Sequence, residues 1–248
     1  MDFDIRKPRH VLALIFLAVS VFLLIVYAAI SYFQPFPSSS GIGNYTGIMK
    51  ILIEIYVLAF SLLFVIILMV IVPIIWYILV NNLRLPEIFQ RLRLHREGLG
   101  SALTWGVVTV IAALVLSVAM DLLLLQFGFD TSKLSNIPQL EQLFSLPTLL
   151  VLVTVQPIAE EIFFRGFLLE KISGMTRPWI GVVVSAVLFG IAHLSYGMLY
   201  TAAMATVLGL LFGIVVMRTK NLYSSITAHI LVNVTSITLF FLGKSLGV

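Results

Sequence analysis

Cysteine and charge are both scarce in this chain of 248 residues. The absence of cysteine excludes a disulfide framework, a cysteine-ligated metal and a thiol nucleophile. Only 10% of the residues are charged, whereas about 25% is usual for a soluble domain. No internal repeat is visible either, and no pair of corresponding broken helices suggests the inverted halves of a transporter.

Apolar residues make up 60% of the chain and gather in long runs. Seven runs are long enough to cross about 30 Å of hydrocarbon. They fall near residues 11–33, 51–80, 101–126, 147–171, 179–196, 198–217 and 222–243. We therefore predict an all-α polytopic membrane protein with about seven transmembrane helices in one integral membrane domain. Pro73 is expected to bend the long second run, or that run tilts.

The basic residues lie in short loops and predict the orientation of the spans. Eleven Lys and Arg residues flank the spans on one side and three on the other: Arg6, Lys7, Arg9, Arg84, Arg91, Arg93, Arg96, Lys171, Arg177, Arg218 and Lys220 against Lys50, Lys133 and Lys244. Because cytoplasmic loops carry the excess, we expect a cytoplasmic N-terminus and an outer C-terminus. This placement indicates membrane lipid as a partner and no nucleic acid. Residues 85–96 read as a short interfacial helix or an ordinary basic loop, and residues 127–146 as a short outer helix.

The fourth span carries three charged residues, Glu160, Glu161 and Arg165. Ionisable groups within a span face a protein interior or a wet cavity and mark a functional site by default. The spacing of Glu161 and Arg165 predicts a helical ion pair. Glu160 points about 100° away around the helix and is expected to be the free carboxylate.

The fifth and seventh spans add imidazole groups at a similar depth. A turn near residue 177 places His193 opposite the two acids, roughly 20 Å from the cytoplasmic end. Phe189 lies one turn before His193, and His229 and Asn233 share a face of the seventh span. We therefore expect an active site buried among spans four, five and seven. Glu54 and Asp121 lie near span ends and are expected to be interfacial.

Two kinds of chemistry fit these residues, and the sequence does not decide between them. A glutamate, two histidines and an asparagine can activate water and stabilise an oxyanion. Glu160, His193 and His229 can also hold a catalytic zinc ion, although the His-Glu-x-x-His helix of metalloproteases is absent. Taken singly, each polar group is as well explained by an interhelical bond. Gly209 and Gly213 are expected to serve close helix packing.

The motifs Glu160-Glu161-x-x-x-Arg165, Phe189-x-x-x-His193 and His229-x-x-x-Asn233 together resemble the CAAX prenyl protease and bacteriocin-processing family (CPBP, or Abi). The resemblance covers about residues 100–243 and divides the chain into N-terminal spans with a basic loop (1–100) and a catalytic core (101–248). It implies an intramembrane peptidase with Glu160 as base, His193 as its aid, and His229 and Asn233 as oxyanion stabilisers. Glu161, Arg165 and Phe189 would organise this site.

The resemblance leaves the metal open, because the family has been described both as metalloproteases and as glutamate-dependent proteases. A site without required zinc is slightly favoured. The leading hypothesis is cleavage of a membrane-associated, CAAX-like or unlipidated peptide on the cytoplasmic side. The alternatives are a non-catalytic bacteriocin-immunity or scaffold protein and a small transporter or proton pathway.

Overall fold

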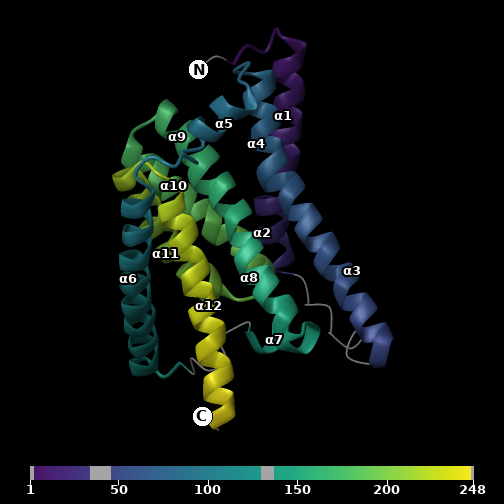
Figure 1. The fold of residues 1–248 in the computed structure, drawn as a ribbon, viewed down its shortest axis with the longest axis vertical. Helices are drawn as coiled ribbons and strands as arrows, with labels where there is room; N and C mark the ends of the chain where they lie inside the picture. Colours follow the sequence, from purple (N-terminus) through teal and green to yellow (C-terminus); the bar gives the residue numbers. More distant parts are fainter. Residues whose placement is uncertain (1–2, 34–45, 130–136, 247–248) are drawn as a thin grey trace.

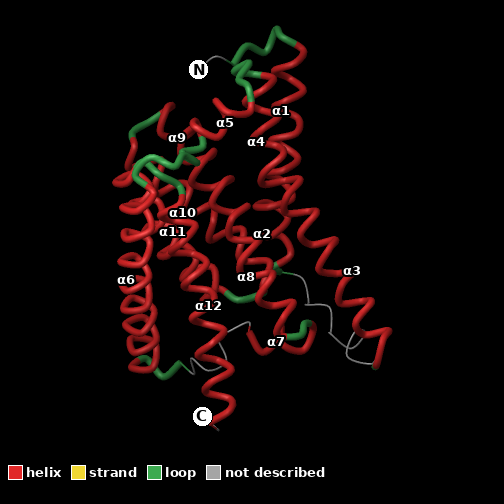
Figure 2. The backbone as a smooth tube through the Cα atoms, viewed as in Figure 1, coloured by secondary structure: helices red, strands yellow, loops and turns green. Residues whose placement is uncertain are grey.

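The computed structural model describes residues 3–33, 46–129 and 137–246, and all regular structure within them is helical (Figure 2). Within these residues, seven helices are long and apolar enough to cross a membrane, as predicted. The seven are Pro8–Ser31 (α1, Pro8–Val21; η1, Phe22–Val26; α2, Tyr27–Ser31), Gly47–Leu79 (α3, Gly47–Ile66; η3, Ile67–Ile71; α4, Val72–Leu79), α6 (Leu99–Gln126), Leu146–Met175 (α8, Leu146–Glu161; η5, Ile162–Leu168; α9, Leu169–Met175), Pro178–Ser195 (α10, Pro178–Ala192, continuing into the 3-10 helix η6, His193–Tyr196), α11 (Leu199–Thr219) and α12 (Tyr223–Leu246).

Two short helices lie between spans. α5 (Leu85–Arg91) forms within the predicted interfacial segment but ends before its last basic residues. α7 (Ile137–Leu143) is the expected short helix before the fourth span. Figure 1 shows α5 near the N-terminal end of the bundle and α7 near the C-terminal end. The two termini therefore lie at opposite ends of the molecule.

The outward face of α6 shows why these helices suit a lipid environment. An apolar stripe at helical spacing is exposed along it, made of Val107, Ile111, Val115, Val118 and Leu122. The inward face carries small residues instead, including Gly106 and Ala113. A Cβ added at Gly106 would lie 2.8 Å from the backbone oxygen of Ser224, so α6 and α12 are in close contact. A soluble protein rarely exposes so long an apolar stripe.

Proline and π-helical turns interrupt two of the long spans. Pro73 lies just after η3, and the ring of a proline clashes with the carbonyl four residues earlier, here that of Met69 within η3. The wider π turn relieves this clash, which explains how the long second span passes the proline. Pro157 lies inside α8, four residues after Val153, and the π-helical segment η5 begins directly after Glu161.

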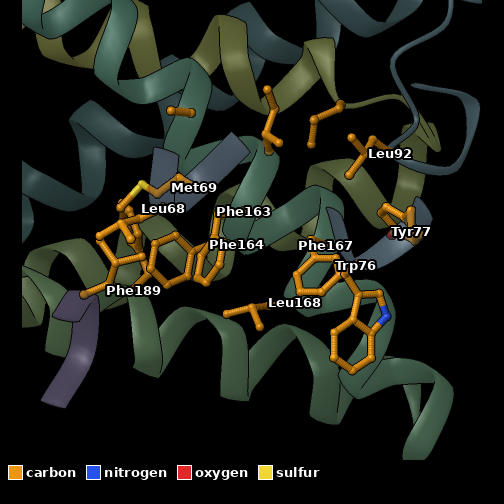
Figure 3. Packing of buried hydrophobic residues seen from close by; sticks show 14 of the residues in the cluster. Leu68, Met69, Trp76, Tyr77, Leu92, Phe163, Phe164, Phe167, Leu168 and Phe189 are labelled. Carbon is orange, nitrogen blue, oxygen red and sulfur yellow. The ribbon is translucent and has the colours of Figure 1, made fainter. Parts of the chain in front are cut away.

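Segment η5 is the centre of the main apolar core (Figure 3). Its residues Phe163, Phe164 and Phe167 are fully buried. They pack in one cluster with residues of η3 and α4 such as Met69 and Trp76. Nearby, the Tyr77 hydroxyl donates to Glu170, which also accepts a hydrogen bond from Arg91 Nε at 2.8 Å. The N-terminal spans are thus joined to the helix that carries the paired acids.

Candidate active site

Glu161 and Arg165 form the predicted ion pair in the interior of the bundle. Arg165 Nη1 donates to Glu161 Oε1 at 2.8 Å, and both side chains are 0% exposed. The guanidinium carbon lies 4.1 Å from the ring centroid of Phe189 and 5.4 Å from that of Phe212. Within the described residues, Arg165 Nε and Nη2 have no hydrogen-bond partner. Aromatic faces therefore replace part of the guanidinium's lost hydration.

The same carboxylate oxygen positions His229. His229 Nδ1 lies 2.9 Å from Glu161 Oε1, and His229 Nε2 lies 3.7 Å from Glu160 Oε2. Because an ionised carboxylate only accepts, the shared proton belongs to Nδ1, which directs Nε2 toward Glu160. Arg165, Glu161 and His229 therefore form a chain that fixes the tautomer and orientation of the imidazole.

Glu160 was expected to be the free carboxylate, and the structure corrects this. It has no contact with the arginine, as predicted, but the Gln156 amide donates to Glu160 Oε1 at 2.7 Å. Gln156 was missed in the sequence, although a polar amide one helical turn before an acid in an apolar span is a usable signal. The bond orients one oxygen of Glu160 and leaves Oε2 toward His229.

Phe189 contacts three groups of the candidate site, namely the imidazoles of His193 and His229 and the guanidinium of Arg165. Its backbone oxygen lies 2.8 Å from His193 Nδ1, and its ring centroid lies 4.4 Å from that of His193. The same ring contacts the imidazole of His229 at 5.7 Å and the guanidinium of Arg165. With Nδ1–H donating to a carbonyl, the neutral imidazole of His193 carries its lone pair on Nε2.

Residues from the three expected spans line one cavity of about 420 Å³. Glu160, His193, His229 and Asn233 all contribute to its wall. The remaining lining residues lie on α6, α7, α8, α10, α11 and α12, and are Ser117, Asp121, Ile137, Leu140, Leu149, Leu152, Val153, Gln156, Pro157, Phe189, Tyr200, Thr201, Met204, Ala205, Leu208, Phe212, Val232, Ser236 and Ile237.

The cavity extends in one direction only from the acids. Its lining runs from Glu160 and His229 toward α7 and the C-terminal part of α6, which lie at the end opposite the N-terminus (Figure 1). On the other side of Glu160, the fully buried residues of η5 fill the bundle. Glu160 and His229 are buried, whereas Asp121, Tyr200 and Asn233 are half-buried. The other polar residues of the lining are therefore more exposed than these two.

Two acids that were expected to be interfacial have specific partners. Glu54 is buried and accepts from the backbone N–H of Ser145 at 2.7 Å, at the start of α8. It fastens α3 to the helix that carries the paired acids. Asp121 lines the cavity and accepts a hydrogen bond from the Tyr200 hydroxyl. Sequence position alone did not show either contact.

Comparison with known proteins agrees with these motifs. Residues 142–235 match the family described as "Type II CAAX prenyl endopeptidase Rce1-like". The resemblance to the CPBP family is confirmed. The match contains all three motifs but is narrower than the expected range of 100–243. The chain is also 27% identical over 143 residues to a protein of Bacillus subtilis (strain 168) described as "Putative membrane peptidase YdiL".

That similarity covers 56% of this chain and 57% of the relative, so the chain spans little more than half the length of the protein it matches. No solved structure matches the chain. The similarity to a membrane-peptidase family therefore comes from the sequence, and the placement of the CPBP motif residues comes from the geometry described above.

The zinc site left open by the CPBP resemblance has a poor fit to this geometry. Within residues 3–33, 46–129 and 137–246, no three histidine, aspartate or glutamate side chains are placed to hold one metal ion.

Proposed function

We propose that the chain is an intramembrane endopeptidase in which Glu160 activates water. The observation that carries this proposal is the meeting of Glu160 with His229 at 3.7 Å in a cavity that His193 and Asn233 also line. The match of residues 142–235 to the Rce1-like endopeptidase family supports it. We assign catalysis to residues 101–248 and anchoring to residues 1–100. The substrate is a membrane-associated peptide, lipidated or not.

The reaction follows from the hydrogen bonds of each group. Glu160 removes a proton from water while His193 Nε2 accepts the water's other proton in a hydrogen bond. The water oxygen bonds to the scissile carbonyl carbon, and the electron pair of the C=O bond moves to oxygen. The protonated Nε2 of His229 and the amide of Asn233 then donate to this oxyanion. Glu160 returns its proton to the amide nitrogen as the C–N bond breaks, which releases an amine and a carboxylic acid.

Glu161 supports this role of His229 without touching substrate. Its negative charge lies 2.9 Å from His229 Nδ1 and stabilises the charged imidazole that an oxyanion requires. Arg165 balances the charge of Glu161 when the imidazole is neutral. These two residues are positioning residues in the proposal.

The proposal also concerns the side of the membrane from which substrate enters. The Lys and Arg count favours a cytoplasmic N-terminus, and the cavity extends toward the opposite end. We therefore replace the expectation of cleavage on the cytoplasmic side with entry from the outer side. The polar lining, which includes Gln156, Asn233 and Ser236, favours a hydrated path.

A cleavage assay on purified protein in liposomes tests the proposal. Lipidated and unlipidated peptides are supplied with and without a chelator. The variants Glu160→Gln and His193→Ala are compared with the control Glu97→Gln, which changes an exposed residue at the opposite end of the helix bundle. We expect the first two variants to lose at least about 100-fold in rate with unchanged thermal unfolding, and the control and the chelator to have no effect. Full cleavage by Glu160→Gln would contradict the assignment.

A further inference from the structure

Asp121 is a carboxylate in the cavity wall that the proposed reaction does not use. It lies on α6, and the hydroxyl of Tyr200 on α11 donates to its Oδ1. Both residues are half-buried and line the same cavity as Glu160. Asp121 lies near the C-terminal end of α6 and Tyr200 near the N-terminal end of α11, and residues of α7 line the same cavity.

The charge of Asp121 has no counter-ion in the part of the chain that the structure describes. None of the ion pairs found there includes it, whereas Glu161, Glu141 and Glu170 each have a cationic partner. A charged residue at membrane depth normally pairs or faces water. One hydroxyl holds the carboxylate in place without neutralising it, so the wall of the cavity carries a fixed negative charge at Asp121.

Most of the other residues that line the cavity are apolar. They include Leu149, Leu152 and Val153 of α8 and Met204 and Leu208 of α11. A mostly apolar cavity that holds a carboxylate apart from the catalytic acid favours an apolar chain next to one positive charge.

We propose that Asp121, oriented by Tyr200, is a specificity-determining residue that binds a cationic group of the substrate, namely a lysine or arginine side chain flanked by apolar residues. This inference rests on the proposed function for the identity of the ligand. The attraction of cations to this part of the cavity does not depend on cleavage, and it is tested separately.

The absence of native cysteine allows a direct measurement of the local charge. In Thr201→Cys, the thiol lies in the cavity wall next to Tyr200, and it is reacted with thiosulfonate reagents that carry a positive or a negative charge. We expect the cationic reagent to react at least about tenfold faster after correction for the rates with a free thiol. Adding Asp121→Asn should remove this preference.

Glu141→Gln is the matched control, because it removes a carboxylate from α7 outside the cavity lining and should leave the preference intact. Equal rates with the two reagents, or a preference that survives Asp121→Asn, would overturn the proposal. Either outcome stands whether or not the protein cleaves peptides.

A second measurement uses cleavage. Peptides of one apolar sequence carry lysine, glutamine or glutamate at a single position, and the position is moved along the peptide. We expect Asp121→Asn to lower kcat/KM for the best lysine peptide about tenfold relative to its glutamine counterpart, and Tyr200→Phe to have a smaller effect. An unchanged ratio would contradict the substrate assignment, whereas no cleavage of any peptide by the native chain would contradict the proposed function instead.

Discussion

Glu161 uses one oxygen for two contacts. Oε1 accepts from both Arg165 and His229, and within the described residues Oε2 has no hydrogen-bond partner. The stability of the helix interior and the orientation of the imidazole therefore depend on the same atom. Removing Arg165 or His229 leaves the buried charge of Glu161 with less compensation. The resulting loss in folding free energy is larger than the net stabilisation that the intact pair provides.

This arrangement predicts a strong non-additivity. Arg165→Met should destabilise the protein by about 3–5 kcal/mol, because it leaves Glu161 ionised in a dry interior. The double variant with Glu161→Gln removes both charges and should be closer to the native protein than Arg165→Met alone. Unfolding in detergent, followed by circular dichroism, measures the three variants. A double variant less stable than Arg165→Met would show that the pair is not coupled in this way.

At this scale the sequence predicted contacts within one helix better than contacts between helices. The spacing of Glu161 and Arg165 was sufficient to predict their bond, and the depth argument brought His193 and His229 to the same cavity. Whether Glu160 or Glu161 bonds to His229 Nδ1 depends on how the helices are rotated about their own axes. Asp121 was assigned to the membrane interface for the same reason. Its depth could be estimated from the sequence, but the direction in which its side chain points could not.

Close contact between α10 and α11 depends on glycine. Gly209 leaves room for Arg165, because an added Cβ would lie 2.9 Å from Nη2. At Gly213 an added Cβ would lie 3.0 Å from a methyl group of Val182, so both glycines pack closely as predicted. The π-helical turns could not be predicted. Over so few residues, a π turn has the same hydrophobic pattern as the α-helix on either side of it.

Gly190 provides the sharpest test of this packing. It is one residue after Phe189, and an added Cβ would lie 2.7 Å from the backbone oxygen of Ala202 and closer still to Thr206 Oγ1. Gly190→Ala should therefore separate α10 from α11 and lower stability by about 1–3 kcal/mol. Gly100→Ala is the control, since that helical glycine has nothing within 4 Å of the added atom. Equal thermal unfolding of the two variants would contradict the packing argument.

For the whole molecule, hydropathy and the equal depth of residues on antiparallel helices were sufficient to predict seven spans and a shared polar level. They could not predict which end of the bundle is open. That property depends on how the spans diverge beyond the acids and on the filling of the other end by η5, whose phenylalanines look like ordinary lipid-facing residues in the sequence. The direction of the cavity is therefore a property of the fold alone.

The direction of access can be tested in cells that express the protein, because a single introduced cysteine is the only thiol in the chain. Ser236→Cys places a thiol in the cavity wall of α12, and Glu97→Cys places one on the exposed segment before α6. A membrane-impermeant maleimide added to intact cells should label the first, and labelling of the second should require inverted membranes. Labelling of Glu97→Cys from outside would reverse the orientation. Because η5 fixes the direction of the cavity within the protein, substrate would in that case enter from the cytoplasm. The same pair of variants therefore decides both the topology and the side of the membrane on which the peptide is cleaved.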